Sequence, residues 1–185
     1  NELRPHFHYN TLDTIKWRAI VSKATNVADC VTALGNLLQP LFRNTKTTWP
    51  LSDELNYLKN YLRIMNYRTG TPIDFTSEID PSILPCLMPK FILQPLLENA
   101  ISHQNPSPAV KNTITLTGHR EDNTIFLVLT DNGLGIDPDR LQVLQELLAS
   151  NEDCTKPLDR ASLPQGIGIG ILNTNRRIKL QYGNA

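Results

Sequence analysis

Apolar positions in the first quarter of the chain recur with helical spacing. Residues 5 to 21 predict one helix, in which Pro5 suits a first turn or marks a kink if helix precedes it. A second helix is predicted from about residue 26 to 41, because its apolar residues lie three or four positions apart: Val27, Val31, Leu34, Leu38 and Leu41. The short polar joint between the two helices predicts an antiparallel hairpin. A hairpin of this size has little core, and packing against a twin hairpin would complete it.

Beyond a linker at residues 43 to 50, helical and strand-like patterns alternate. A third helix is predicted with Ser52 as its N-cap and an end near residue 70. Strands are predicted at residues 73–79, 113–118 and 125–129, the last of them central because it is apolar throughout. Further helices are predicted at residues 90–103, where Pro95 should disturb the early turns, from residue 137 onward and at residues 170–181. Residues 150 to 165 lack a clear period and are predicted to form a mobile loop.

Together these patterns predict an α+β fold with two domains. Residues 1–45 would form the helical hairpin, and residues 46–185 would form an α/β sandwich. We find no internal repeat and no low-complexity tract that would favour another architecture.

Composition excludes several classes of protein. The 185 residues include 18 Lys+Arg and 18 Asp+Glu, so the formal net charge is +0, which argues against a nucleic-acid partner. No stretch approaches the ~18 uninterrupted apolar residues of a membrane span. Three widely separated cysteines favour reduced thiols over a disulfide scaffold or a zinc site. We therefore expect a soluble, intracellular, globular chain.

The segment from Leu96 to His103 places two polar residues in an otherwise apolar helix. Asn99 could present its side-chain oxygen to Mg²⁺, which prefers oxygen ligands and bridges to phosphates. A polar pair that simply faces the surface is the alternative, and on its own this signal is weak.

The segment from Asp131 to Gly135 follows the apolar strand directly. Asp131 could accept a hydrogen bond from an adenine amino group at the strand end, while Gly133 and Gly135 would let the backbone approach the base. Asp-Asn-Gly is also an ordinary turn sequence, and this alternative is favoured for the segment alone.

The segment GIGIGILN, which begins at Gly166, leads into the last predicted helix. The alternating glycines Gly166, Gly168 and Gly170 would offer backbone N–H groups and a helix N-terminus to phosphate. A flexible glycine hinge explains the same pattern about equally well.

The order of these segments resembles the ATP-binding domain shared by histidine kinases, gyrase and MutL, the Bergerat fold. RPHFHYNTL, which begins at Arg4, is similar to the phosphoacceptor box of the YesM/LytS-type sensor histidine kinases. LNYLKNYLRIMNYRTG, LQPLLENAISH, DNGLGID and GIGILNTNRRIKLQYG agree with that family over essentially the whole chain.

The resemblance implies a function and a set of site residues. His6 would be phosphorylated by ATP, and its phosphoryl group would pass to an aspartate of a response regulator. Asn99 would hold Mg²⁺, Asp131 the adenine, and the backbone of the three glycines the phosphates, beneath a lid at roughly residues 141–165. The family also implies a homodimer formed through the hairpin.

The resemblance further implies that this chain is part of a larger protein. We expect the sandwich to be incomplete at its C-terminus. We also expect an upstream sensor and membrane spans, so that these residues are the cytoplasmic portion of a bacterial cell-membrane protein.

Several positions depart from the family pattern. His8 replaces an apolar residue and is expected to lie on the surface, and Phe7 stands where many histidine kinases carry an acidic base. Asn10, one helical turn from His6, could orient His6 or a water. Ser102 stands where many relatives have a phosphate-binding lysine, a contact that one of three other residues could supply: His103, Arg176 or Arg177.

These departures leave two alternatives to a kinase. A degenerate kinase could bind ATP and a partner without transferring phosphate. A gyrase-like ATPase without a phosphoacceptor is disfavoured, because Pro95 occupies the position of the glutamate base in such enzymes.

Overall fold

The computed structural model describes residues 5–43, 46–70, 72–107, 109–150 and 168–183. These residues divide into two compact units. The first comprises residues 1–47 and 55–73, and the second comprises residues 48–54 and 74–185. The division places most of the third helix with the hairpin, whereas the predicted domain boundary at residue 45 stays a prediction.

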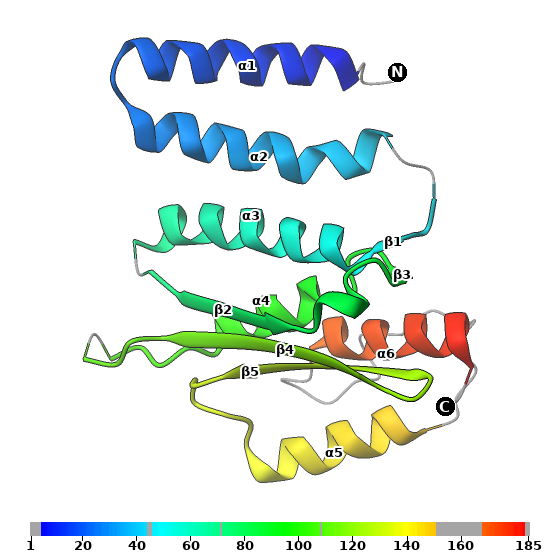
Figure 1. The fold of residues 1–185 in the computed structure, drawn as a ribbon. Coiled ribbons are helices and arrows are strands. Elements are labelled where there is room, and N and C mark those ends of the chain that lie inside the picture. Colours follow the sequence, from blue (N-terminus) through cyan, green and yellow to red (C-terminus); the bar gives the residue numbers. More distant parts are fainter. Residues whose placement is uncertain (1–4, 44–45, 71, 108, 151–167, 184–185) are drawn as a thin grey trace. The chain divides into compact units, whose positions relative to one another are not determined.

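The first unit contains an antiparallel pair of helices, α1 (Pro5–Val21) and α2 (Thr25–Arg43), shown in blue in Figure 1. The joint between them is tight: Lys23 adopts a left-handed φ of 57°, and the backbone N–H of Ala24 donates to the carbonyl of Ala19 at 2.8 Å. The predicted hairpin is present, and α2 continues through Pro40.

The apolar stripe of α2 is only partly buried. Ala28 and Ala33 are buried, whereas three members of the predicted stripe are exposed: Val27, Leu34 and Leu41. On α1, Trp17 is 65% exposed and Val21 is 80% exposed. The hairpin therefore presents apolar surface, because one helix pair cannot enclose the side chains on both of its sides.

The helix α3 (Leu51–Thr69) begins one residue before the predicted N-cap, so Ser52 lies inside the helix. Its first turn belongs to the second unit and the rest to the first. Asp53 and Glu54 occupy the first turn, where negative charge suits the helix dipole. Leu58 and Leu62 lie on its buried side.

The second unit contains a three-stranded sheet with the order β2-β4-β5. The strand β2 (Asp74–Ile79) is parallel to β4 (Thr113–Glu121), and β5 (Thr124–Asp131) is antiparallel to β4. The turn from β4 to β5 falls at the predicted position, with Asp122 at a φ of 51°. Between β2 and β4 come the 3-10 helix η1 (Pro81–Ile83), the strand β3 (Leu87–Pro89) and the helix α4 (Gln94–Ser102).

Two strand predictions are wrong. The apolar strand β5 is an edge of the described sheet, with Phe126 42% and Val128 50% exposed, and the central strand is β4, with Ile114 and Leu116 buried. Residues 48–50, assigned to a linker, form β1 (Thr48–Pro50), which pairs antiparallel with β3. Three residues are too few to show the alternation that identifies a strand.

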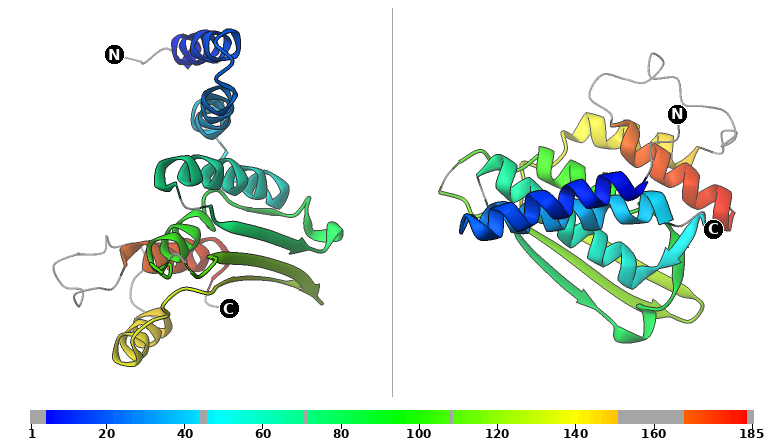
Figure 2. Two further views of the ribbon diagram at one scale, coloured as in Figure 1. Left: turned by 90° about the vertical axis from the view of Figure 1, so that its left-hand side faces the viewer. Right: turned by 90° about the horizontal axis from the view of Figure 1, so that it is seen from above.

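The helices of the second unit include α5 (Pro138–Ala149) and α6 (Ile169–Tyr182). Figures 1 and 2 show α4 and α6 side by side on one face of the sheet. Side chains buried on this face form the core of the unit: Ile83, Leu93, Leu97, Ile114, Leu116 and Leu172. Of residues 150–165, predicted as a mobile loop, all but Ser150 lie outside the described residues. The predicted lid begins inside α5 and then also leaves the described part.

The helix predicted at residues 90–103 begins later, at Gln94. Pro95 lies in its first turn and disturbs nothing, because that position has no backbone acceptor for an N–H group. The preceding residues instead form a turn in which Phe91 has a φ of 57°. No helix within the described ranges is long and apolar enough to cross a membrane.

Candidate functional site

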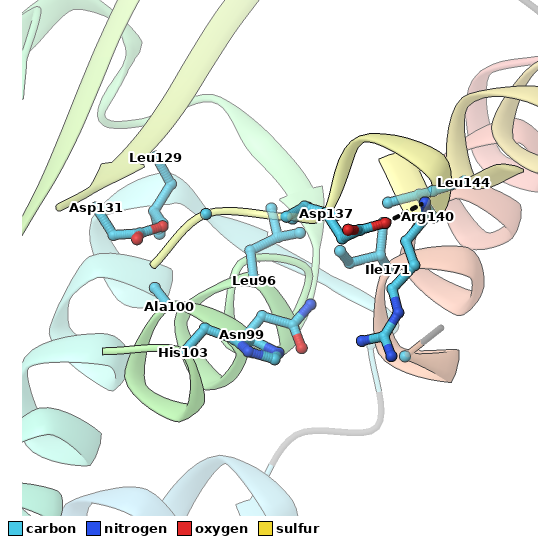
Figure 3. A pocket seen from close by; sticks show the side chains of 13 residues that line it. Leu96, Asn99, Ala100, His103, Leu129, Asp131, Asp137, Arg140, Leu144 and Ile171 are labelled. Carbon is cyan, nitrogen blue, oxygen red and sulfur yellow. Dashed lines mark hydrogen bonds between the residues drawn. The ribbon is translucent and has the colours of Figure 1, made fainter. Parts of the chain in front are cut away.

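A cavity of about 350 Å³ lies in the second unit between α4, the end of β5, α5 and the start of α6 (Figure 3). Its apolar lining comes from Leu96, Ala100, Leu129, Ile136, Leu144 and Ile171. Its polar lining comes from Asn99, His103, Asp131, Asp137 and Arg140, with Gly135 and Gly168 between them. An apolar cavity with a few convergent polar groups is typical of a small-ligand site.

The α4 wall carries two of the predicted side chains. Asn99 and His103 are one helical turn apart and therefore share a face. The opposite face of α4 is held in the core by Leu97, which is 0% exposed. This packing directs Asn99 and His103 to the cavity.

The neighbours of Asn99 on α4 form contacts within the helix. Gln94 donates its amide to Oε1 of Glu98 at 2.8 Å. The hydroxyl of Ser102 donates to the carbonyl of Glu98 at 2.8 Å. Glu98, for which the sequence offered no role, thus serves contacts along the helix.

Asp131 is the last residue of β5 and borders the cavity. Its Oδ1 accepts a hydrogen bond from the backbone N–H of Gly133 at 2.8 Å, which closes a turn directly after the strand. One carboxylate oxygen therefore holds the loop, and the second remains for a ligand.

The two glycines of this loop serve different needs. A Cβ at Gly133 would lie 2.4 Å from the backbone oxygen of His103, and that oxygen also accepts the N–H of Leu134 at 3.0 Å. The contact that requires glycine at position 133 is therefore with the end of α4. Gly135 lines the cavity with a φ of +74°, a conformation that favours glycine.

The N-terminus of α6 faces the cavity. Gly168 is its N-cap and provides no side-chain cap, so the first N–H groups of the helix are available to an anion. The Oδ1 of Asn99 lies 3.5 Å from the place of a Cβ on Gly168. Gly170 packs against α4 instead, with its Cβ position 3.2 Å from the Cβ of Pro95. Gly166 lies outside the described residues.

The predicted phosphoacceptor lies in the other unit. His6 is in the first turn of α1, and the side chains of His6 and His8 are outside the described part of the structure. Asn10 is exposed, and its carbonyl accepts the hydroxyl of Thr14 at 2.8 Å.

Of the three residues suggested to replace the missing lysine, only His103 lines the cavity. Arg177 donates to the carbonyl of Phe91 at 3.2 Å and to the carbonyl of Lys90, which ties α6 to the turn before α4. Arg176 is not a lining residue.

Arg140 was not predicted as a site residue, yet it brings a guanidinium to the cavity. Helical spacing from Leu144, which is buried, could have identified it, because residues four apart share a helix face. Glu54 was not predicted as a site residue either, and its side chain is completely buried.

Glu54 supports the turn that precedes α4. Its Oε2 accepts the indole N–H of Trp49 at 2.6 Å and the N–H of Phe91 at 2.8 Å, and its Oε1 accepts the N–H of Leu93 at 2.8 Å. Burial raises the pKa of the Glu54 carboxyl, although these N–H donors oppose the rise.

The described residues contain no group of three His, Cys, Asp or Glu side chains that could hold a metal ion. Asn99 offers one oxygen at the cavity. This donor set fits Mg²⁺, which commonly takes one or two protein ligands and completes its shell with phosphates and waters.

Two family models match the chain. Residues 1–73 match the model described as histidine kinase. Residues 88–185 match the model described as histidine kinase-, DNA gyrase B-, and HSP90-like ATPase. The cavity lies wholly within the second match.

The chain is similar to two sensor kinases over nearly all of its length. It is 29% identical over 182 residues to the sensor histidine kinase YesM of Bacillus subtilis (strain 168), covering 98% of this chain and 28% of that protein. It is 29% identical over 184 residues to the sensor protein kinase HptS of Staphylococcus aureus (strain USA300), covering 99% of this chain and 33% of that protein. The chain therefore spans about a third or less of these relatives.

A similar solved structure is the histidine kinase domain of a blue-light activated histidine kinase from Erythrobacter litoralis EL346. The match covers 90% of this chain and 74% of that chain, at 18% sequence identity and a TM-score of 0.44.

Proposed function

Because the chain belongs to the sensor histidine kinase family, we propose that it is the catalytic core of such a kinase. It phosphorylates itself on His6 from ATP and then passes the phosphoryl group to an aspartate of a response regulator. The family match over residues 88–185 implies ATP binding, while the acceptor, the metal and the partner are parts of the proposal.

One observation carries the proposal: Asn99, Asp131 and the uncapped N-terminus of α6 border the same cavity. Asp131 offers an acceptor for an adenine amino group, and the first N–H groups of α6 offer donors to phosphate. Asn99 would contribute one oxygen to Mg²⁺, which would supply charge stabilisation to the transferring phosphoryl group when bound.

The neutral imidazole of His6 acts as the nucleophile toward the γ-phosphorus: the N–P bond forms as the bond from phosphorus to the bridging oxygen breaks, and ADP leaves. Asn10 lies one turn along α1 and orients this imidazole or a water. Phe7 provides no base, so the imidazole proton passes to another acceptor.

The hairpin is proposed to form the homodimer interface. Its exposed apolar side chains support this proposal, since Trp17, Val21 and Leu41 lie on the surface of an isolated hairpin. The hairpin would end near residue 45, and the catalytic domain would follow. The whole protein would be anchored in a bacterial cell membrane, with these residues on the cytoplasmic side.

The test is autophosphorylation with γ-labelled ATP and magnesium. Wild type, His6→Ala and His8→Ala are compared at equal nucleotide occupancy, and the label is tested for acid lability and base stability. We expect an acid-labile label that His8→Ala retains and His6→Ala loses.

Each other result points to a different conclusion. Loss only in His8→Ala would keep the kinase and move the acceptor. ATP binding without any label would indicate a degenerate binding module. Steady ATP hydrolysis by His6→Ala would indicate a gyrase-like ATPase.

A further inference from the structure

The positive charge at the cavity comes from α5, a helix in which no phosphate-binding residue was predicted. Arg140 is the only Lys or Arg among the residues that line the cavity, as far as the described chain extends. It lies in the first turn of α5, which begins directly after the Asp131 loop. In Figure 3 its side chain runs toward the side of the cavity where Asn99 lies, while Asp131 lies on the opposite side.

The first turn of α5 is held firmly at its backbone. The Oδ1 of Asp137 accepts the N–H groups of Asp139 at 3.1 Å and of Arg140 at 3.3 Å. One turn later, Leu144 is buried on the same helix face. The face that carries Arg140 is therefore directed to the cavity by a cap and by a core residue.

The other end of α5 is tied to α6. Lys179 donates its ammonium to the carbonyls of Leu148 at 2.8 Å and Ser150 at 3.0 Å. Asn175 donates its amide to the carbonyl of Leu148 at 3.1 Å. Gly168, at the start of α6, lines the same cavity. These contacts therefore hold α5, which carries Arg140, to α6, whose N-terminus faces the cavity.

Among the described residues that line the cavity, the basic side chains are those of Arg140 and His103. Asp137 is acidic and caps α5, and the hydroxyl of Ser102 donates to the carbonyl of Glu98. Arg177 donates to two backbone carbonyls outside the cavity. A nucleoside triphosphate carries several negative charges, so a site lined by Asp131 and Asp137 needs a cation at its phosphate end.

We propose that Arg140 binds a phosphate group of the nucleotide and sets the preference of the site for triphosphate over nucleoside. This inference rests on the proposed function, because it assumes that ATP occupies the cavity. A planar guanidinium suits phosphate oxygens, to which it can donate two parallel hydrogen bonds. Many relatives have a phosphate-binding lysine at the position of Ser102. In this chain Arg140, on α5, supplies that positive charge.

The test is a set of binding titrations with ATP, ADP and adenosine in the presence of magnesium. Wild type is compared with Arg140→Gln, Arg140→Lys and the charge-matched control Arg120→Gln, which alters an exposed residue of β4 outside the cavity. Thermal melts establish that each variant is folded.

We expect Arg140→Gln to weaken ATP binding by about tenfold or more, as for loss of a charge-assisted hydrogen bond. Adenosine binding should change less than about twofold, Arg140→Lys should recover part of the ATP affinity, and Arg120→Gln should bind as wild type does. Equal weakening of ATP and adenosine, or an unchanged ATP affinity, would overturn the role of Arg140. A wild type that binds no ATP would refute the proposed function itself.

Discussion

Two carboxylates of the second unit show how differently the same chemical group is used. Glu54 is 0% exposed and accepts three N–H donors around the turn at residues 90–93. Asp131 is exposed at the cavity and accepts one N–H donor, from Gly133. The buried carboxylate uses both of its oxygens on the protein and supports the fold, whereas the exposed one keeps an oxygen for a ligand.

The turn held by Glu54 matters because it precedes α4. Phe91 has a left-handed φ of 57°, its N–H donates to Glu54, and its carbonyl accepts from Arg177 of α6. A left-handed conformation is costly for a residue with a Cβ, so it requires such support. Glu54 and Arg177 together hold the start of α4, whose following turn carries Asn99.

The largest expected effect is from Glu54→Ala. This change removes the acceptor for three N–H groups and leaves a void, so we expect a loss of about 3 to 5 kcal/mol in the free energy of unfolding. Urea denaturation would measure it. The matched control Glu78→Ala, at an exposed position of β2, should leave the stability unchanged. Equal losses in both variants would abolish the proposed contrast between buried and exposed carboxylates.

A smaller effect is expected from Gly133→Ala, which tests how rigidly the Asp131 loop is held. The new Cβ would lie 2.4 Å from the His103 oxygen, so the loop must move, at a cost of roughly 1 to 3 kcal/mol. Denaturation should show a loss of stability, and ATP titration a loss of affinity.

Gly35→Ala is the control, because this helical glycine has nothing within 4 Å of its Cβ position. That change should stabilise the chain by about 0.5 to 1 kcal/mol. If Gly133→Ala changed neither the free energy of unfolding nor the ATP affinity, the loop would not be rigidly held.

A pH dependence is the next expected effect. Because burial raises the pKa of Glu54 above its ordinary value of 4.5, the folded state holds this proton more tightly than the unfolded state does. The resulting stabilisation is complete below pH 4.5 and is lost as the pH rises through the raised pKa. The stability of wild type relative to Glu54→Gln should therefore fall with rising pH across that range. Urea denaturation at a series of pH values would measure this difference in the free energy of unfolding. If the difference instead rises with pH, the three N–H donors lower the pKa of Glu54 by more than burial raises it.

The smallest effect on stability is expected from Asp131→Asn. The asparagine Oδ1 can keep the bond to Gly133, so the free energy of unfolding should change by less than about 0.5 kcal/mol. The second oxygen becomes an NH2 donor, which cannot accept from an adenine amino group. ATP and adenosine binding should both weaken by about tenfold in titrations. A large loss of stability with unchanged binding would reverse the roles given to Glu54 and Asp131.

Much of the fold was predictable because its signals are local. The helical periods of α2, α5 and α6 and the alternation in β4 identify these elements, and the motifs around Asn99, Asp131 and Gly168 indicated three polar contributions to one cavity. The failures concern partners distant in the chain. The apolar pattern of β5 could not distinguish a central from an edge strand, and β1 exists only through its pairing with β3.

The sequence by itself determined the family, the element order and most of the polar residues of the cavity, since these depend on residue type and spacing. Only the tertiary structure decided which charged groups reach the cavity. Arg177 was a candidate for phosphate and instead holds a turn, while Arg140 and Glu54 were not predicted to contribute to the site. Charge alone does not tell a ligand contact from a structural one; what separates them is which backbone groups the fold brings within hydrogen-bonding distance.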